Sequence, residues 1–179
     1  MIQHKYDHFI KEKAEVAEAD KCRTFGKGER REDFAAMWNA TGTLLLAGLP
    51  GSGRRALAGI LSERLGLPVR DVLDGNSLRD ALAGGPSVVV LDDALFDDEA
   101  SVVAIGGAGK VFYLMADAGV LARRIARQAG REDVETIQQG VAARLEAVEP
   151  HFMRALHFIL QAGSPSEDLA GDVLEKVAW

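Results

Sequence analysis

The sequence has a single cysteine among its 179 residues, no long hydrophobic run and no excess of positive charge. Cys22 has no second cysteine for an internal disulfide or a Cys-based zinc site, which favours a reducing compartment. No segment approaches the roughly 18 apolar residues that span a membrane, and residues 1–13 lack the apolar core of a signal peptide. The net charge of −6 argues against a general binder of nucleic acids or anionic membranes. We therefore expect a cytoplasmic protein whose ligand is a small molecule.

The composition is that of a folded globular protein, with 47% hydrophobic and 27% charged residues. Residues 1–40 contain no run suited to a buried strand, and the spacing of their apolar residues predicts amphipathic helices at 6–20 and 31–38. We predict two parts: a helical N-terminal extension of residues 1–40 and a domain of residues 41–179. The extension is a candidate surface for a protein partner or for self-association.

From residue 43 onward, short apolar segments alternate with segments of helical periodicity. The predicted strands are 43–47, 68–72, 87–91, 110–115 and 157–160, and the predicted helices are 54–65, 77–82, 97–105, 119–128, 134–148 and 165–177. Strands that alternate with helices are joined by crossovers, which produce a mostly parallel sheet with both faces covered. The expected fold is therefore α/β, a three-layer α/β/α sandwich around a five-stranded, mostly parallel sheet.

A glycine-rich segment, GLPGSGRR, joins the first predicted strand to the first helix of this domain. Such a segment is typical of a P-loop, in which backbone N–H groups and the positive end of the helix bind phosphate. The candidate phosphate-binding residues are Gly48, Gly51, Ser52, Gly53, Arg54 and Arg55. A P-loop normally has Lys and then Ser or Thr at the last two positions, so Arg54 keeps the charge while Arg55 removes the hydroxyl that ligates Mg²⁺. The alternative is a glycine-rich turn that binds no ligand.

Two carboxylates, Asp92 and Asp93, follow the predicted strand 87–91. An Asp at the end of a buried strand holds Mg²⁺ in the Walker B element, so Asp92 is a candidate metal ligand. Acidic residues in this position also cap the helix that follows. Both interpretations stay open.

From residue 43 to residue 177 the order of segments resembles the shikimate kinases, a family of P-loop small-molecule kinases. The motifs that carry the resemblance are the GLPGSG loop, LSERLGLP at 61–68, KVFYL at 110–114 and the arginines Arg124 and Arg131, which are seven residues apart. The resemblance implies ATP or ADP with Mg²⁺ as cofactors. It also implies that Asp71 helps to hold the metal and that Arg124 and Arg131 contact the nucleotide and the transferring phosphate. Alternatively, Arg131 belongs to a solvated helix face.

The departures from this family lie on the side of the acceptor substrate. The residues LDD at 91–93 replace the glycine turn that approaches shikimate, Val148 replaces an arginine, and the substrate-binding insertion after Asp71 is missing. Together with the changed loop, they predict a degenerate nucleotide- or phosphate-binding module with weak or no kinase activity. The alternative is an active ATP-dependent phosphotransferase in which Arg54, Asp93 and Arg131 are catalytic and Asp93 or Asp74 is the base.

Overall fold

The computed structural model describes residues 41–177, so the helices predicted at 6–20 and 31–38 lie outside the described residues. Among the described residues, one sheet contains β1 (Leu44–Ala47), β2 (Val69–Val72), β3 (Val88–Leu91), β4 (Lys110–Met115) and β5 (Phe158–Gln161). The strand order is β2-β3-β1-β4-β5, and every neighbouring pair is parallel. The predicted five-stranded α/β sheet is thus confirmed, and it is entirely parallel.

The strands alternate with helices along the chain. The helices are α2 (Arg54–Leu65), α3 (Gly75–Ala83), the 3-10 helix η2 (Asp93–Asp97), α4 (Glu99–Gly106), α5 (Ala118–Ala129), α6 (Val134–Ala155) and α7 (Ser166–Val177). No helix within the described residues is long and apolar enough to cross a bilayer.

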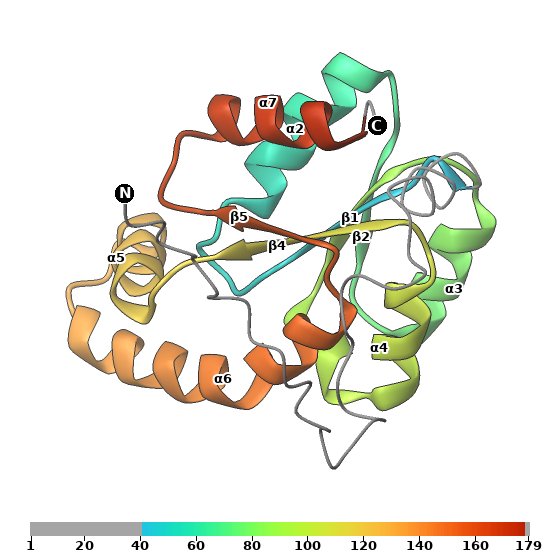
Figure 1. Cartoon of the computed structure of the whole chain (residues 1–179). Coiled ribbons are helices and arrows are strands. Elements are labelled where there is room, and N and C mark those ends of the chain that lie inside the picture. Colours follow the sequence, from blue (N-terminus) through green and yellow to red (C-terminus); the bar gives the residue numbers. More distant parts are fainter. Residues whose placement is uncertain (1–40, 178–179) are drawn as a thin grey trace, which may run out of the picture. The chain divides into compact units, whose positions relative to one another are not determined.

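β1 lies at the centre of the sheet and is buried on both faces. Leu44 and Leu46 belong to a core cluster that includes residues of α2 and α7. Leu45 and Ala47 point to the other face, where the cluster includes residues of α3, α4, α5 and α6. Figure 1 shows α2 and α7 on one side of the sheet and α4 and α6 on the other. These two cores confirm the three-layer sandwich.

Three of the described helices differ from their predicted bounds by two residues or more. α3 begins two residues earlier than expected, because the Asp74 carboxylate accepts hydrogen bonds from the backbone N–H groups of the first turn. The helix expected at 97–105 begins two residues later, at Glu99, because Asp98 caps α4 by accepting from Ser101 N at 2.9 Å, and the 3-10 helix η2 precedes it. α6 continues through Pro150 to Ala155 instead of ending at residue 148.

The extra turns of α6 are held by aromatic packing. The ring of Phe152, which is 1% exposed, lies edge-on to Phe96 with centroids 4.5 Å apart. The same ring stacks on Tyr113 at a centroid distance of 4.8 Å. A proline inside a helix costs about 3 kcal/mol, an amount that burial of one large aromatic side chain offsets. Tertiary packing therefore decides where α6 ends.

Candidate functional site

The glycine-rich loop connects the end of the central strand β1 to the beginning of α2. Its last residue, Gly53, is the N-cap of α2 and has a φ of 92°, in the left-handed region. The cap makes no side-chain hydrogen bond to the helix, and the first turn contains no acidic residue. The backbone N–H groups of this turn therefore keep their capacity to bind an anion, and the helix dipole favours one there.

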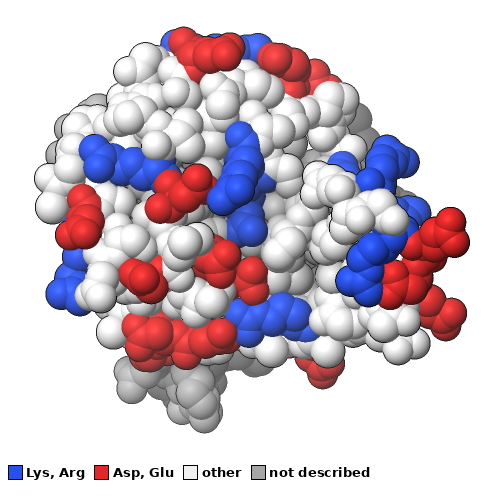
Figure 2. All heavy atoms as spheres, turned by 180° about the vertical axis from the view of Figure 1, so that it is seen from behind, with Lys and Arg blue, Asp and Glu red and all other residues white. Residues whose placement is uncertain are grey.

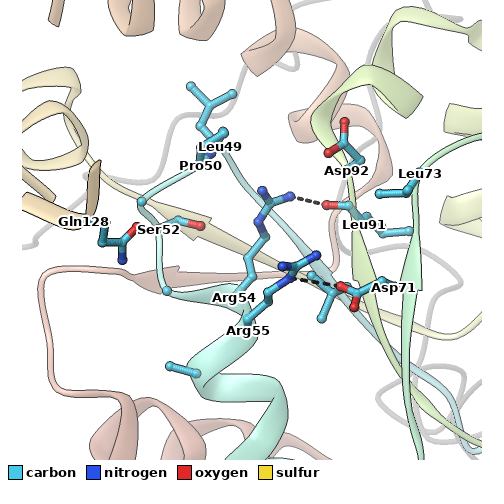
Figure 3. Close-up of a pocket in the computed structure, with 14 residues that line it drawn as sticks. Leu49, Pro50, Ser52, Arg54, Arg55, Asp71, Leu73, Leu91, Asp92 and Gln128 are labelled. Carbon is cyan, nitrogen blue, oxygen red and sulfur yellow. Dashed lines mark hydrogen bonds and ion pairs between the residues drawn. The ribbon is translucent and has the colours of Figure 1, made fainter. Parts of the chain in front are cut away.

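Ser52 supplies a second feature of the same loop. The residue is 2% exposed, and among the described residues its hydroxyl has no hydrogen-bond partner. Figure 3 shows the Ser52 side chain on the side of the loop where Arg54 lies. Since buried polar atoms are nearly always hydrogen-bonded in proteins, the unpaired hydroxyl indicates a place for a ligand atom.

A pocket of about 350 Å³ lies between the loop and the carboxyl ends of β2 and β3. Its lining residues are Leu49, Pro50, Gly51, Ser52, Gly53, Arg54, Arg55, Ala56, Asp71, Leu73, Val90, Leu91, Asp92 and Gln128. Seven of the residues predicted as site residues are thus brought together, namely Gly51, Ser52, Gly53, Arg54, Arg55, Asp71 and Asp92. Gly48 begins the loop without lining the pocket.

Arg54 crosses the pocket from α2 to the end of β3 (Figure 3). Its Nη1 donates a hydrogen bond to the backbone carbonyl of Leu91. Burial lowers the pKa of the guanidinium, and the charges of Asp93 and Asp92 oppose this shift. Because an arginine remains protonated in proteins, Arg54 contributes a full positive charge to the inner part of the pocket.

Arg55 lies beside Arg54 and is paired with a predicted metal ligand. Its Nε donates to Oδ1 of Asp71 at 3.1 Å. The two side chains are 75% and 48% exposed, so this ion pair adds at most about 1 kcal/mol to stability. Its main effect is to orient the guanidinium at the edge of the pocket.

The two carboxylates after β3 are separated by the structure. Asp92 lines the pocket and accepts a hydrogen bond from Ala94 N at 3.0 Å, so it caps η2. Asp93 points away to α6, where Nε of Arg144 donates to its Oδ2 at 2.7 Å. Arg144 also binds Asp97, with a bond of 2.7 Å from Nη1. Among the described residues no group of three His, Cys, Asp or Glu side chains could hold a metal ion.

The two arginines that the resemblance predicted to contact the nucleotide have different environments. Nη1 of Arg124, on α5, donates to the carbonyl of Gly51 at 3.2 Å and thus contacts the loop directly. Arg131 is paired with Asp133 through an Nε to Oδ1 bond of 2.9 Å and does not line the pocket. Arg131 follows Gly130, the C-cap of α5, and precedes α6, so it lies in the connection between these helices and not on a helix face.

Gln128 lines the pocket and was missed by sequence reasoning. It follows Arg124 by four residues on α5, and residues with this spacing lie on the same face of a helix. The spacing was therefore a signal that could have identified it once Arg124 had been chosen.

Figure 2 shows one face of the molecule, on which small groups of basic side chains are separated by acidic ones and no broad area has a single sign. That face therefore offers no continuous basic surface of the kind that binds the backbone of a nucleic acid.

Comparisons with known proteins agree with this architecture. No protein-family model matches the sequence, and no curated protein matches it. Among solved structures, the shikimate kinase from Acinetobacter baumannii in complex with shikimate has a TM-score of 0.67 and 16% identity, over 80% of this chain and 97% of that one. The shikimate kinase from Bacteroides thetaiotaomicron has a TM-score of 0.65 and 16% identity, over 76% and 98% of the chains.

A third similar structure is the YorR protein from Bacillus subtilis in complex with phosphorylated GDP. Its TM-score is 0.63 at 18% identity, over 76% of this chain and 95% of that one. At these identities the likeness shows the fold alone. The protein thus has a shikimate-kinase-like P-loop kinase fold with a strongly diverged sequence, as the resemblance predicted.

Proposed function

We propose that this protein is a cytoplasmic nucleotide- or phosphate-binding module on a P-loop kinase fold, with weak or no kinase activity. The observation that carries the proposal is the anion site itself: the uncapped first turn of α2, the buried and unpartnered Ser52 hydroxyl, and two arginines that line the same pocket. These are the backbone and side-chain donors that bind a phosphate group.

The weak or absent kinase activity is inferred from the two candidate bases. Asp93 is 15% exposed and held by Arg144, outside the pocket lining. Asp74 caps α3, and hydrogen bonds from Ser77 lower the pKa of its carboxyl. A general base must reach the proton that it removes, and neither carboxylate lines the pocket that contains the loop.

The shape of the acceptor side supports the same proposal. β2 ends at Val72 and α3 begins at Gly75, so no additional segment lies between them to form a pocket for a second substrate. Phosphoryl transfer depends largely on the positioning of both reactants. A site without such a segment is expected to bind one reactant rather than to transfer a group between two.

The second candidate function is an ATP-dependent phosphotransferase. It is favoured by the position of Asp71 and Asp92, which line the same pocket as Arg54 and the loop. In this hypothesis the two carboxylates hold Mg²⁺ and Arg54 takes the place of the P-loop lysine. The structural neighbours include proteins described with shikimate and with phosphorylated GDP, which suggests these compounds as first ligands to assay.

Calorimetric titration of the full chain with ADP, ATP and inorganic phosphate tests the proposal, together with a charge variant. Ala56 lies in the first turn of α2, is exposed and lines the pocket. Ala56→Glu should weaken phosphate binding at least tenfold, while the new carboxylate interacts favourably with the helix dipole and leaves the protein at least as stable.

Ala100→Glu is the matched control, because Ala100 is also exposed and lies in the first turn of α4, away from the pocket. We expect ligand binding to be unchanged in this variant. Absence of binding by the wild-type protein, or equal loss in both variants, would contradict the proposed site. Turnover of ATP with shikimate or another acceptor would instead favour the phosphotransferase.

A further inference from the structure

We infer that this site binds its phosphate ligand without a divalent cation, and that the Arg55 guanidinium occupies the role that a magnesium ion has in P-loop kinases. The inference rests on the proposed function and specifies its ligand class: a phosphate group, free or in a nucleotide, that is not complexed with metal. Three observations on the pocket lead to it.

The first observation is the set of donors at the expected metal position. In P-loop enzymes the ion is held by the hydroxyl of a Ser or Thr and by a carboxylate. Here the hydroxyl position is Arg55, whose side chain has no acceptor atom and cannot ligate a cation. Asp71 already neutralises this guanidinium at 3.1 Å, and the Asp92 carboxylate is engaged in capping η2. The residues present therefore do not fit Mg²⁺.

The second observation is the way in which Asp71 holds Arg55. The contact uses Nε, and in the described part of the chain neither terminal nitrogen of the guanidinium has a hydrogen-bond partner. Asp71 thus fixes the direction of the group while its outer edge, with two parallel N–H donors, stays available. This edge matches the geometry of two phosphate oxygens. Asp71 is in this inference a positioning residue rather than a metal ligand.

The third observation is the balance of charge. Four ionised side chains line the pocket, and the charges of Arg54 and Arg55 are matched by those of Asp71 and Asp92. Arg124, which binds the carbonyl of Gly51, adds one positive charge beside the loop. A phosphate group without a bound metal is attracted by these guanidinium groups and by the backbone N–H groups in the first turn of α2. A dication would be placed next to two arginines, where like charges repel.

The test is the affinity of the full chain for ADP, measured by calorimetry in excess EDTA and again in excess MgCl₂. For the wild-type protein we expect equal affinities within about threefold, or tighter binding in EDTA. The variant Arg55→Ser restores the hydroxyl and releases Asp71, so it should bind ADP at least tenfold more tightly with Mg²⁺ than in EDTA. The control Arg55→Lys keeps the charge without the hydroxyl and should remain indifferent to Mg²⁺.

The outcomes separate this inference from the proposed function. Binding by the wild-type protein that is at least tenfold tighter with Mg²⁺ would overturn the inference and leave the phosphate site intact. Absence of binding in both conditions, for ADP and for inorganic phosphate, would overturn the proposed function and the inference with it. The comparison of the two conditions uses the unmodified protein, so it does not depend on how well either variant folds.

Discussion

The phosphate loop contains two glycines whose substitution by alanine should have different consequences. Gly51 and Gly53 both have a positive φ, of 84° and 92°. A Cβ atom at Gly51 would lie 3.0 Å from the carbonyl oxygen of Leu121 and 3.2 Å from Cγ1 of Ile125, both on α5. A Cβ atom at Gly53 would meet no atom within 4 Å. A comparison of the two alanine variants therefore distinguishes the cost of backbone strain, which both have, from the cost of a steric clash with α5, which only Gly51→Ala has.

The expected losses in the free energy of unfolding follow from these contacts. An alanine in the left-handed region costs about 1–2 kcal/mol in either variant. Part of this cost, roughly 0.4–1 kcal/mol, is offset because alanine also lowers the conformational entropy of the unfolded chain. Gly51→Ala also forces α5 to shift, which adds about 1–3 kcal/mol as in overpacked cores. We expect a total of about 2–4 kcal/mol for Gly51→Ala and about 1 kcal/mol for Gly53→Ala. In a protein of this size these values lower the Tm by about 4–16 °C and about 2–4 °C.

Thermal unfolding followed by circular dichroism measures both losses. The shift of α5 also moves Arg124 and Gln128, so ADP binding should fall further in Gly51→Ala than in Gly53→Ala. Equal Tm values for the two variants would refute the contact between the loop and α5. A Gly51→Ala protein as stable as the wild type would refute the loop conformation itself.

Three further predictions concern α6 and the loop. Phe152→Ala should lower the free energy of unfolding by about 3–5 kcal/mol in urea titrations, and a loss below about 1 kcal/mol would show that α6 does not pack beyond Pro150 as described. Arg144→Met should raise the pKa of Asp97, which its guanidinium holds below the usual range, when the carboxyl is titrated by NMR. In the wild-type protein this ion pair stabilises the folded state above about pH 4, and the stabilisation is lost as the pH falls through the lowered pKa of Asp97. The variant should lack this pH-dependent stabilisation, and an unchanged acid titration would contradict the ion pair. Ser52→Ala removes an unpaired buried hydroxyl, so ADP affinity should fall while the ligand-free protein keeps its stability, whereas a less stable protein would indicate that the hydroxyl has a protein partner.

Much of the fold was predictable because it depends on patterns within short segments. Apolar runs of strand length alternate with helical periodicity, and this alternation requires parallel crossovers whatever the surface residues are. The strand 110–115 and the helix 54–65 have the bounds that the sequence predicted. The glycine-rich loop could likewise be recognised, since its glycines and the helix that follows are adjacent in the chain.

The partners of the charged residues could not be predicted in this way. Asp93 was one of two candidate bases in the phosphotransferase hypothesis, but its partner Arg144 is 51 positions away, and Asp71 meets Arg55 across 16 positions. A sequence shows that opposite charges exist without showing which of them come within hydrogen-bond distance. The helix predicted at 134–148 was expected to end at residue 148, and only the packing of Phe152 in the core explains why it continues through Pro150.

The sequence by itself therefore determined the α/β architecture, the position of the phosphate loop and the loss of its Lys and Ser or Thr. Only the tertiary structure decided that Asp93 and Arg131 lie outside the pocket, that Gln128 lies within it, and that Arg55 is oriented by Asp71. The physical reason is the range of the forces involved. Backbone conformation follows from residues a few positions apart, whereas ion pairs and side-chain packing form between segments that meet only when the sheet has assembled.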